Sequence, residues 1–421
     1  MDVLKMEHQL ISVVAKMEME GVKIDLKLLK ATEEKLLALQ INFDKQIKAF
    51  TQNGININSN TQLSTLLFET LAIIPIDETI GKNGCFKVNK AHLLKLIDDH
   101  EIISLLLKYR LTTSLLKFCS QLSKIHPKTQ RLHASFNQIG TETGRFSSSK
   151  PNLQNVPNVK AEDDEKDELK ILASQFRNVF VPKRGFQFIC ADYSQIELRV
   201  MAHFSQDPFL VKAYNEGLDI HRLTASLIFD IELSKVNDEQ RQIAKSINFG
   251  LIYGKTAHGL APTLTEITGK AYTVEQAQRV INDYFTKFAG VKTCLEKLIE
   301  QADGRGYSTT IFGRKRSIPQ LQSSKLSERQ SGKRIAKNSP IQGTAADILK
   351  IAMIKCDQAI TKQDLKSKMI LTVHDELLFE VPSDEMIIME SLVKDTMENS
   401  VKLTVPLVVD LKTGTNWAIA H

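Results

Sequence analysis

Cysteine is scarce in this sequence and its few copies are scattered. The chain has five, Cys85, Cys119, Cys190, Cys294 and Cys356. None forms a CxxC pair, and no spacing matches a zinc site. The pattern therefore excludes a disulfide framework and a zinc module, and it predicts reduced thiols in a cytosol-like compartment.

Long apolar runs, targeting signals and repeats are also missing. No apolar stretch approaches the ~18 residues that a membrane span needs, so we expect no membrane partner. The first residues include an early acid, Asp2, and no apolar signal core, so secretion is not expected. The sequence has no internal repeat, no low-complexity tract and no long Gly/Ser linker.

What the sequence does contain is an ordinary globular composition with a basic excess. The 421 residues are enough for two or three domains with a buried core. Charged residues make up 25%, hydrophobic residues 42%, and the net charge is +6. This balance favours a polyanionic partner such as nucleic acid, although many unrelated enzymes share it.

The first third of the chain has helical spacing. Apolar residues from about 10 to 50 follow a helical period that is interrupted at Gly21. Residues 53–60 form a polar loop in which Ser59 or Asn60 could cap the next helix. A second helical stretch, from about 89 to 123, carries four cations, which could also be a solvated basic face: Lys95, Lys108, Arg110 and Lys117.

The remainder mixes strands with helices. Residues 186–191 predict a strand that ends at Asp192 and leads into a helix over 195–204, and residues 207–301 are mostly helical. Residues 369–373 and 377–381 predict a β-hairpin with 374–376 at its tip and Pro382 after it. We therefore predict an α+β fold, a small antiparallel sheet with two large helical insertions.

Two carboxylates stand at strand ends. Asp192 closes the first strand and Asp375 lies at the hairpin tip. A carboxylate this close to buried strands risks a desolvation cost of several kcal/mol unless it has a partner. A divalent metal would suit two converging acids, but an aspartate at a strand end is also a common turn former or helix cap.

A helix over 241–254 carries Arg241, Lys245, Phe249 and Tyr253 at intervals of four. This spacing places them on one stripe. Cations at one end and aromatic rings at the other could hold a triphosphate and stack a base. The alternative is that the rings belong to the core and the cations to the surface.

Two polar strips are candidate nucleic-acid contacts. Residues 141–157 surround Arg145 with hydroxyls and amides that could follow a nucleic-acid backbone, or could form a polar surface loop. A second strip from Arg334 through Asn338 to Gln342 precedes an expected helix over 345–353. Its amides could contact minor-groove acceptors or cap that helix.

Taken together, these segments resemble family A DNA polymerases of the bacterial DNA polymerase I type. Residues 192–199 match the first catalytic motif of the family, 241–254 the second and 373–376 the third. Residues 141–157, 219–222 and 342–347 also match in family order, and the resemblance continues to Trp417.

The resemblance implies a right-hand polymerase with palm, fingers and thumb. The implied divisions are a palm-leading helix at 1–24, a thumb at 25–130, a first palm part at 131–203, fingers at 204–335 and a second palm part at 336–421. It further implies template-directed addition of dNTPs to a primer 3′-hydroxyl on primer–template DNA, by a chain that we expect to be monomeric. The implied compartment is a bacterial-type cytosol or nucleoid, with an organellar or phage source left open.

The resemblance also assigns residues. Asp192, the Tyr193 carbonyl and Asp375 would hold two Mg²⁺ ions, for which Mn²⁺ could substitute, and Lys245 would protonate the pyrophosphate. The dNTP would contact Gln195, Glu197, His221, Arg241, Lys245, Phe249 and Tyr253. The DNA would contact Arg145, Asn152, Gln154, Arg334, Asn338, Gln342 and His374. Thumb lysines would add phosphate contacts that weaken with salt.

Sugar selectivity follows from the same resemblance. Glu197 would be the steric gate that crowds a ribose 2′-hydroxyl, with Tyr253 stacked alongside. Phenylalanine at position 249, rather than tyrosine, matches family members that discriminate against dideoxynucleotides.

The sequence departs from the family in two respects. Where the family has an arginine shortly after Pro157, this chain has Val159 and Lys160, and lysine lacks the bidentate fork. An acidic run over 162–168 follows, and we expect it to be a solvated loop. Nuclease domains that often precede the polymerase are not in this sequence, so it has no proofreading domain, or it is the polymerase portion of a longer protein.

Three other functions are alternatives to a general DNA polymerase of family A. A single-subunit RNA polymerase shares the palm and a similar fingers helix, but Glu197 and the Phe249-Gly250 pair favour DNA synthesis. A non-catalytic DNA-binding subunit would not need Asp192, Asp375, Lys245 and Arg241 together. A repair or lesion-bypass polymerase is not distinguished by any motif, and neither are replication, processivity, strand displacement and reverse transcription.

Overall fold

The fold is organised around an antiparallel sheet of four strands, seen in the computed structural model that describes residues 2–51, 54–75, 80–81, 84–157 and 166–421. The strand order is β10-β5-β9-β8. The bounds are β5 Phe186–Tyr193, β8 Lys368–Val373, β9 Glu376–Pro382 and β10 Val409–Gly414. The predicted strand over 186–191 and the predicted hairpin are confirmed, and they lie side by side in the sheet.

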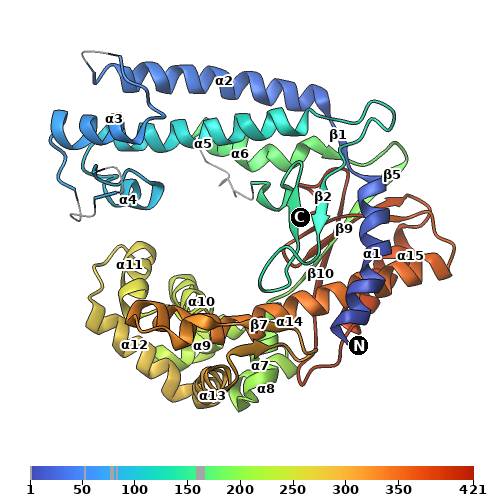
Figure 1. The fold of residues 1–421 in the computed structure, drawn as a ribbon. Helices are drawn as coiled ribbons and strands as arrows, with labels where there is room; N and C mark the ends of the chain where they lie inside the picture. The colour runs from blue at the N-terminus through green and yellow to red at the C-terminus, as the bar shows by residue number, and fades with distance from the viewer. Residues whose placement is uncertain (1, 52–53, 76–79, 82–83, 158–165) are drawn as a thin grey trace.

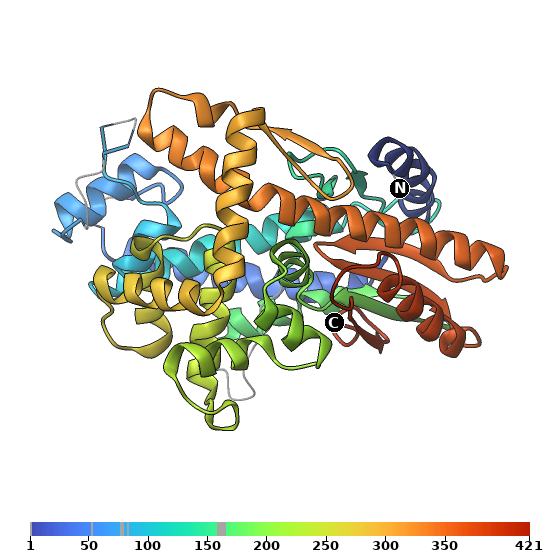
Figure 2. The ribbon, with the colours of Figure 1, turned by 90° about the horizontal axis from the view of Figure 1, so that it is seen from below.

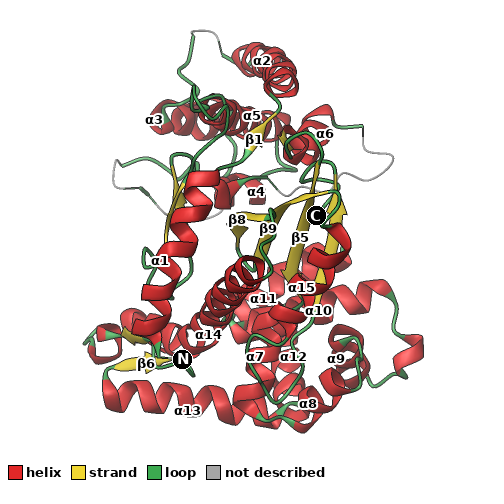
Figure 3. Ribbon diagram, turned by 90° about the vertical axis from the view of Figure 1, so that its right-hand side faces the viewer, coloured by secondary structure: helices red, strands yellow, loops and turns green. Residues whose placement is uncertain are grey.

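Three helices adjoin this sheet: α1 Val3–Glu20, α14 Leu326–Lys362 and α15 Met386–Glu398 (Figures 1 and 3). Helices α1 and α15 contact its strands, and α14 packs against both of these helices. A buried polar network joins α1 to α14. The Lys350 ammonium donates to Glu7 at 2.7 Å and to the Gln138 carbonyl at 2.7 Å. Arg314 pairs with Asp347 at 2.8 Å and also with Glu7. Two acids and two cations thus offset one another's desolvation.

A long helical pair lies on one side of the molecule. Helices α2 Leu26–Lys48 and α5 Glu101–Leu122 run side by side across the top of Figure 1. Gly21 ends α1 at a φ of 63°, as the interruption at that residue predicts, and the Asp25 side chain caps α2. Ser59 caps α3 Asn60–Ser64, which decides between the two predicted caps.

The expected single helix over 89–123 is divided in two. Helix α4 Lys90–Lys95 ends before residues 96–100, and α5 begins with the His100 side chain as its cap. Two of the four predicted surface cations have partners within the protein. Arg110 donates to the Val88 carbonyl at 2.5 Å, and Lys108 pairs with Asp167 at 2.9 Å. This basic face is therefore only partly solvated.

The second helical group lies across from that pair, at the bottom of Figure 1. It contains α8 Pro208–Asn215, α9 Ile220–Phe229, α10 Asp238–Ile252, α11 Ala257–Thr268, α12 Val274–Lys287 and α13 Ala289–Arg305. Helix α7 Ile196–Ser205 leads into it directly from β5. Helix α10 starts with a capping box: Asn237 accepts from the Gln240 amide at 2.8 Å, and Gln240 accepts in return at 3.0 Å.

The remaining elements are short: α6 Glu168–Ser174, β1 Lys23–Ile24, β2 Ser135–Asn137, β3 Ser147–Ser149, β4 Phe180–Val181, β6 Tyr307–Thr309 and β7 Lys315–Ser317. Figure 2 views the same arrangement from below, with α14 crossing beside the sheet. No helix among the described residues is long and apolar enough to cross a membrane.

Candidate active site

The two strand-end aspartates meet at the ends of two neighbouring interior strands, β5 and β9. Asp192 is in β5 opposite Glu376, the first residue of β9, and Asp375 directly precedes Glu376. The Tyr193 amide donates to the Asp375 carbonyl at 3.3 Å. Antiparallel register therefore brings together two acids that are 183 positions apart in sequence. The predicted convergence of Asp192 and Asp375 is found.

The turns that carry these acids are braced. Gln195 and His374 both have a φ of 53°, in the left-handed region that costs a side-chain-bearing residue about 1 kcal/mol. The Gln154 side chain holds the second turn, because it donates to the Thr372 carbonyl at 2.9 Å and accepts from the His374 amide at 3.0 Å. Gln154 thus supports the Asp375 turn, a role that the sequence did not suggest.

Burial and neighbouring charges change the proton affinity of both acids. Burial, followed by the nearby Asp375 and Glu376 carboxylates, raises the pKa of Asp192 to about 7. Burial also raises the pKa of Asp375, against a lowering by Arg145. Crowded carboxylates of this kind are stabilised by a divalent cation. The donor set is all oxygen, which fits Mg²⁺ or Mn²⁺.

Helix α10 forms the opposite wall. Arg241, Lys245 and Phe249 lie on it at intervals of four, and Tyr253 is its C-cap residue, so the predicted stripe exists. The rings of Phe249 and Tyr253 are stacked, 6.5 Å apart with an interplanar angle of 18°. The Arg241 Nε atom donates to Asp219 at 2.7 Å, and that pairing lowers the pKa of Asp219 in spite of partial burial.

A cavity of about 310 Å³ lies between Asp375 and this wall, and Asp192 is not part of its lining. All seven predicted dNTP contacts line it: Gln195, Glu197, His221, Arg241, Lys245, Phe249 and Tyr253. Arg145, Tyr193, Ile196 and Asp375 complete the lining. The Tyr193 hydroxyl is not directed at the aspartates; it donates to the Met397 carbonyl at 2.8 Å. A second cavity, of about 760 Å³, lies beside α10 and includes Lys245, Phe249, Tyr253 and Arg334 in its lining.

Glu197 joins the two sides of the smaller cavity. It is only 4% exposed, in the first turn of α7. It accepts hydrogen bonds from the Tyr253 hydroxyl and from Arg145. Burial raises its pKa, and Arg145 and Tyr253 oppose that rise. Arg145, which the sequence suggested only as a DNA contact, therefore also holds Glu197.

The predicted DNA contacts on α14 lie inside a helix rather than before one. Helix α14 is continuous from Leu326 to Lys362 and contains Pro340, so the suggestion that the strip caps a helix over 345–353 is wrong. Its N-cap residue is Lys325. Arg334, Asn338 and Gln342 are four apart and share one face. The Asn338 amide donates to the Tyr253 carbonyl at 3.1 Å, which ties α14 to the end of α10.

The segment after Pro157, with the expected lysine substitution and acidic loop, is described only from residue 166 onward. Val159, Lys160 and residues 162–165 lie outside the described part of the chain. The expectation of a solvated loop is wrong for Asp167, whose side chain caps α6 and pairs with Lys108. Asn152, a predicted DNA contact, accepts locally from the Gln154 amide at 3.1 Å.

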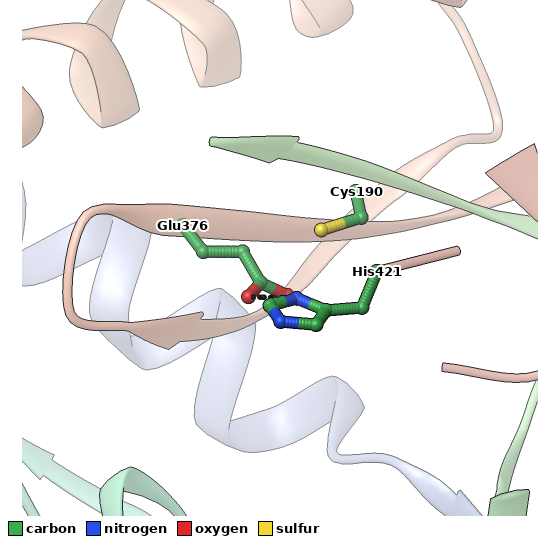
Figure 4. A group of neighbouring side chains, drawn as sticks. All are labelled: Cys190, Glu376 and His421. Carbon is green, nitrogen blue, oxygen red and sulfur yellow. Dashed lines mark ion pairs between the residues drawn. The ribbon is translucent and has the colours of Figure 1, made fainter. Parts of the chain in front are cut away.

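Sequence reasoning missed the surroundings of Glu376. Its carboxylate pairs with His421 Nδ1 at 2.9 Å (Figure 4). It also accepts from Trp417 Nε1 at 2.6 Å, and Arg177 lies 3.7 Å away. Burial would raise the pKa of Glu376, but hydrogen bonds from His421, Cys190 and Trp417 lower it overall. The only signal in the sequence was a second acid directly after Asp375.

Cys190, Glu376 and His421 also have the residue types of a metal site, with their ligand atoms within 4.8 Å of one another. However, burial strongly raises the pKa of the Cys190 thiol, which disfavours the thiolate that a metal needs. The Arg177 cation already faces the same carboxylate. We therefore interpret the group as the internal support of Glu376.

Comparison with known proteins agrees with this geometry. A solved structure of the polymerase domain of Pol1 from M. smegmatis, in complex with DNA primer–template and dNTP, superposes with a TM-score of 0.89 at 36% identity and covers 98% of this chain and 70% of that one. The fold is therefore the α+β right-hand polymerase fold.

The family follows from the sequence matches. The model of DNA polymerase family A matches residues 26–419, and this chain belongs to that family. DNA polymerase I of Caldicellulosiruptor bescii is 43% identical over 417 residues, 98% of this chain and 46% of that protein. DNA polymerase I of Bacillus subtilis is 38% identical over 416 residues, 98% of this chain and 45% of that protein. The chain spans about half the length of these curated relatives.

Proposed function

We propose that this chain carries out template-directed DNA synthesis, adding dNTPs to a primer 3′-hydroxyl with release of pyrophosphate. The observation that supports this most is the cavity between Asp375 and α10, with Arg241 and Lys245 on its helical side. Opposite charges across one small cavity suit a metal-bound triphosphate. The M. smegmatis relative, whose structure contains primer–template and dNTP, is consistent with the same use.

Asp192, Asp375 and the Tyr193 carbonyl would hold two Mg²⁺ ions. Bound there, the ions would lower the pKa of the 3′-hydroxyl and neutralise charge on the leaving group. The protein's own part is to hold the two carboxylates close together in spite of their repulsion, which the sheet register and the Gln154 brace do.

The α10 side chains would bind the nucleotide. Arg241 and Lys245, with His221 beside them, would contact the triphosphate, and Lys245 would donate a proton to the pyrophosphate. The stacked Phe249 and Tyr253 rings offer an apolar face to the base and sugar. Gln195 lines the same cavity. Closure of α10 over the dNTP would align the reacting atoms.

Glu197 would exclude ribonucleotides. Because it is buried and held by both Arg145 and Tyr253, it cannot easily move aside for a 2′-hydroxyl. The same fixed side chain distinguishes this proposal from an RNA polymerase, which must accept that hydroxyl.

The primer and template would lie along the polar face of α14 and the neighbouring turns. Arg334, Asn338 and Gln342 present one helical face, and Arg145, Asn152, Gln154 and His374 flank the Asp375 turn. The divisions at 1–24, 25–130, 131–203, 204–335 and 336–421 remain our proposal for palm, thumb and fingers. A monomeric state and a bacterial cytosol or nucleoid likewise stay predictions.

Primer extension tests the proposal. A labelled primer on a DNA template is incubated with Mg²⁺ and either dNTPs or rNTPs, and a 3′-mismatched primer is run in parallel. We expect templated extension with dNTPs only and no trimming of the mismatch. Salt-sensitive DNA binding without extension under any metal would instead support a non-catalytic subunit.

A further inference from the structure

A buried amide links the nucleotide-facing helix α10 to α9. Asn248 of α10 and Thr224 of α9 are both 0% exposed, and His221 of α9 is 2% exposed. Asn248 Nδ2 lies 3.0 Å from His221 Nδ1. Thr224 Oγ1 lies 3.1 Å from Asn248 Oδ1 and 3.0 Å from Nδ2. His221 and Thr224 are one turn apart on α9, so both face the same amide.

The His221 ring is neutral near pH 7. Burial, together with the Arg241 and Lys245 cations, lowers its pKa to about 4, and Asp219 only partly opposes that fall. A neutral imidazole has one N–H, on either Nδ1 or Nε2, and the hydrogen bond at one nitrogen decides which. The tautomer of His221 matters, because a ring nitrogen that faces a triphosphate with its lone pair repels it, whereas an N–H attracts it.

The Asn248 amide can make that choice. An amide nitrogen is a donor without an acceptor lone pair. With Nδ2 directed at Nδ1, Nδ1 must accept, and the ring proton is left on Nε2. No hydrogen bond to Nε2 is found among the residues that the structure describes, and His221 lines the cavity of about 310 Å³ beside Arg241 and Lys245.

We propose that Asn248 is a positioning residue that holds neutral His221 in its Nε2–H tautomer, so that the ring offers an N–H to the nucleotide triphosphate. This inference rests on the proposed dNTP-binding function of the cavity. The Thr224 hydroxyl contacts the same amide, donating to Oδ1 and accepting from Nδ2. The result is a neutral donor near the Arg241 and Lys245 cations, which would repel an imidazolium.

The tautomer can be measured in the wild-type protein without any substitution in the amide. Histidine is labelled with ¹⁵N, and the ring nitrogens are observed by long-range ¹⁵N–¹H correlation in the nucleotide-free chain. The His221 signals are assigned by their loss in His221→Gln. We expect protonated Nε2 and unprotonated Nδ1. A wild-type ring with Nδ1–H would overturn the proposal.

Two substitutions connect the tautomer to nucleotide binding. Asn248→Asp replaces the donor by an acceptor of the same shape, and Asn248→Leu removes the hydrogen bond at similar volume. Each should raise the KM for dNTP about tenfold, the worth of one hydrogen bond to a charged group, and change kcat less. Asn248→Asp should also move the proton to Nδ1. Asn282→Asp, an exposed change on the adjacent α12, is the matched control and should change neither.

A double-mutant cycle separates positioning from general support of the fold. In a His221→Gln background, Asn248→Leu should raise the KM no further. An equal rise in both backgrounds would mean that Asn248 acts without His221, and the proposal would fail. If wild-type protein makes no DNA at all, the proposed function itself fails, and the NMR result still decides the tautomer.

Discussion

The two sides of the cavity are built by different means. The acidic side is formed by the ends of strands β5 and β9, where the strand register and the Gln154 hydrogen bonds hold Asp192 and Asp375 close together. The basic side is a single helix, whose four-residue period alone aligns Arg241, Lys245 and Phe249. The ends of β5 and β9 hold carboxylates that repel one another, and burial together with this repulsion raises the pKa of Asp192 to about 7. Two carboxylates that repel one another are held together by contacts between residues far apart in the sequence. A helix aligns its cations through the spacing of neighbouring residues alone.

Removing one acid should have the largest effect. Asp375→Ala takes away half of the carboxylate pair, and we expect synthesis to fall by about a thousandfold or more, since loss of several kcal/mol of charge stabilisation corresponds to that factor. Primer extension measures the rate, and gel-shift titration should show nearly unchanged DNA binding. Near-normal extension by this variant would refute the metal role of the acidic side.

Glu197 connects the two sides, and its loss should affect sugar choice. Glu197→Ala opens space where a 2′-hydroxyl would lie, so rNTP incorporation relative to dNTP should rise about tenfold to a hundredfold. The Tyr253 hydroxyl also loses its acceptor. The measurement is the ratio of kcat/KM for matched dNTP and rNTP. An unchanged ratio would mean that another group excludes the ribose.

The helical side should tolerate change more readily. Phe249→Tyr adds one hydroxyl to a ring that is already beside Tyr253, and we expect use of dideoxynucleotides to rise by about tenfold or more. Chain termination at increasing dideoxynucleotide-to-dNTP ratio measures it. Equal termination by both proteins would show that the cavity differs from that of the family members it resembles.

The smallest effect concerns stability. The folded-state pKa of Asp192 is raised from 3.8 to about 7, so without metal its ionisation destabilises the fold as pH rises through that window. Asp192→Asn should therefore stabilise the metal-free protein at pH 8, by on the order of 2 kcal/mol. The gain should vanish below about pH 4, where both states of the wild type are protonated.

Denaturant titrations at the two pH values, with chelator present, test this stability effect. Asp44→Asn is the control, since Asp44 is partly exposed and forms an i,i+4 pair with Lys48 on the surface of α2. If Asp192→Asn is no more stable than wild type at pH 8, burial and the neighbouring carboxylates do not destabilise the ionised Asp192 side chain.

Local patterns predicted the helical side well. Arg241, Lys245, Phe249 and Tyr253 could be placed on one stripe from spacing alone, because the helical period depends only on neighbouring residues. The hairpin that carries Asp375 was equally clear from two short apolar runs on either side of a polar tip, and from Pro382. The length of α14 was not, because Pro340 argues locally for an end, and burial of the following segment overrides it.

What the sequence determined by itself is the order of motifs and the kinds of residue in them: two strand-end acids, a cationic helix and the family to which they belong. Only the tertiary structure decided which of these residues touch. The pairing of Arg145 with Glu197, the enclosure of Glu376 by Trp417 and His421, and the contact of Asn248 with His221 all join different elements. Such contacts depend on how the elements pack and on the strand register, and the spacing of residues within one segment predicts neither.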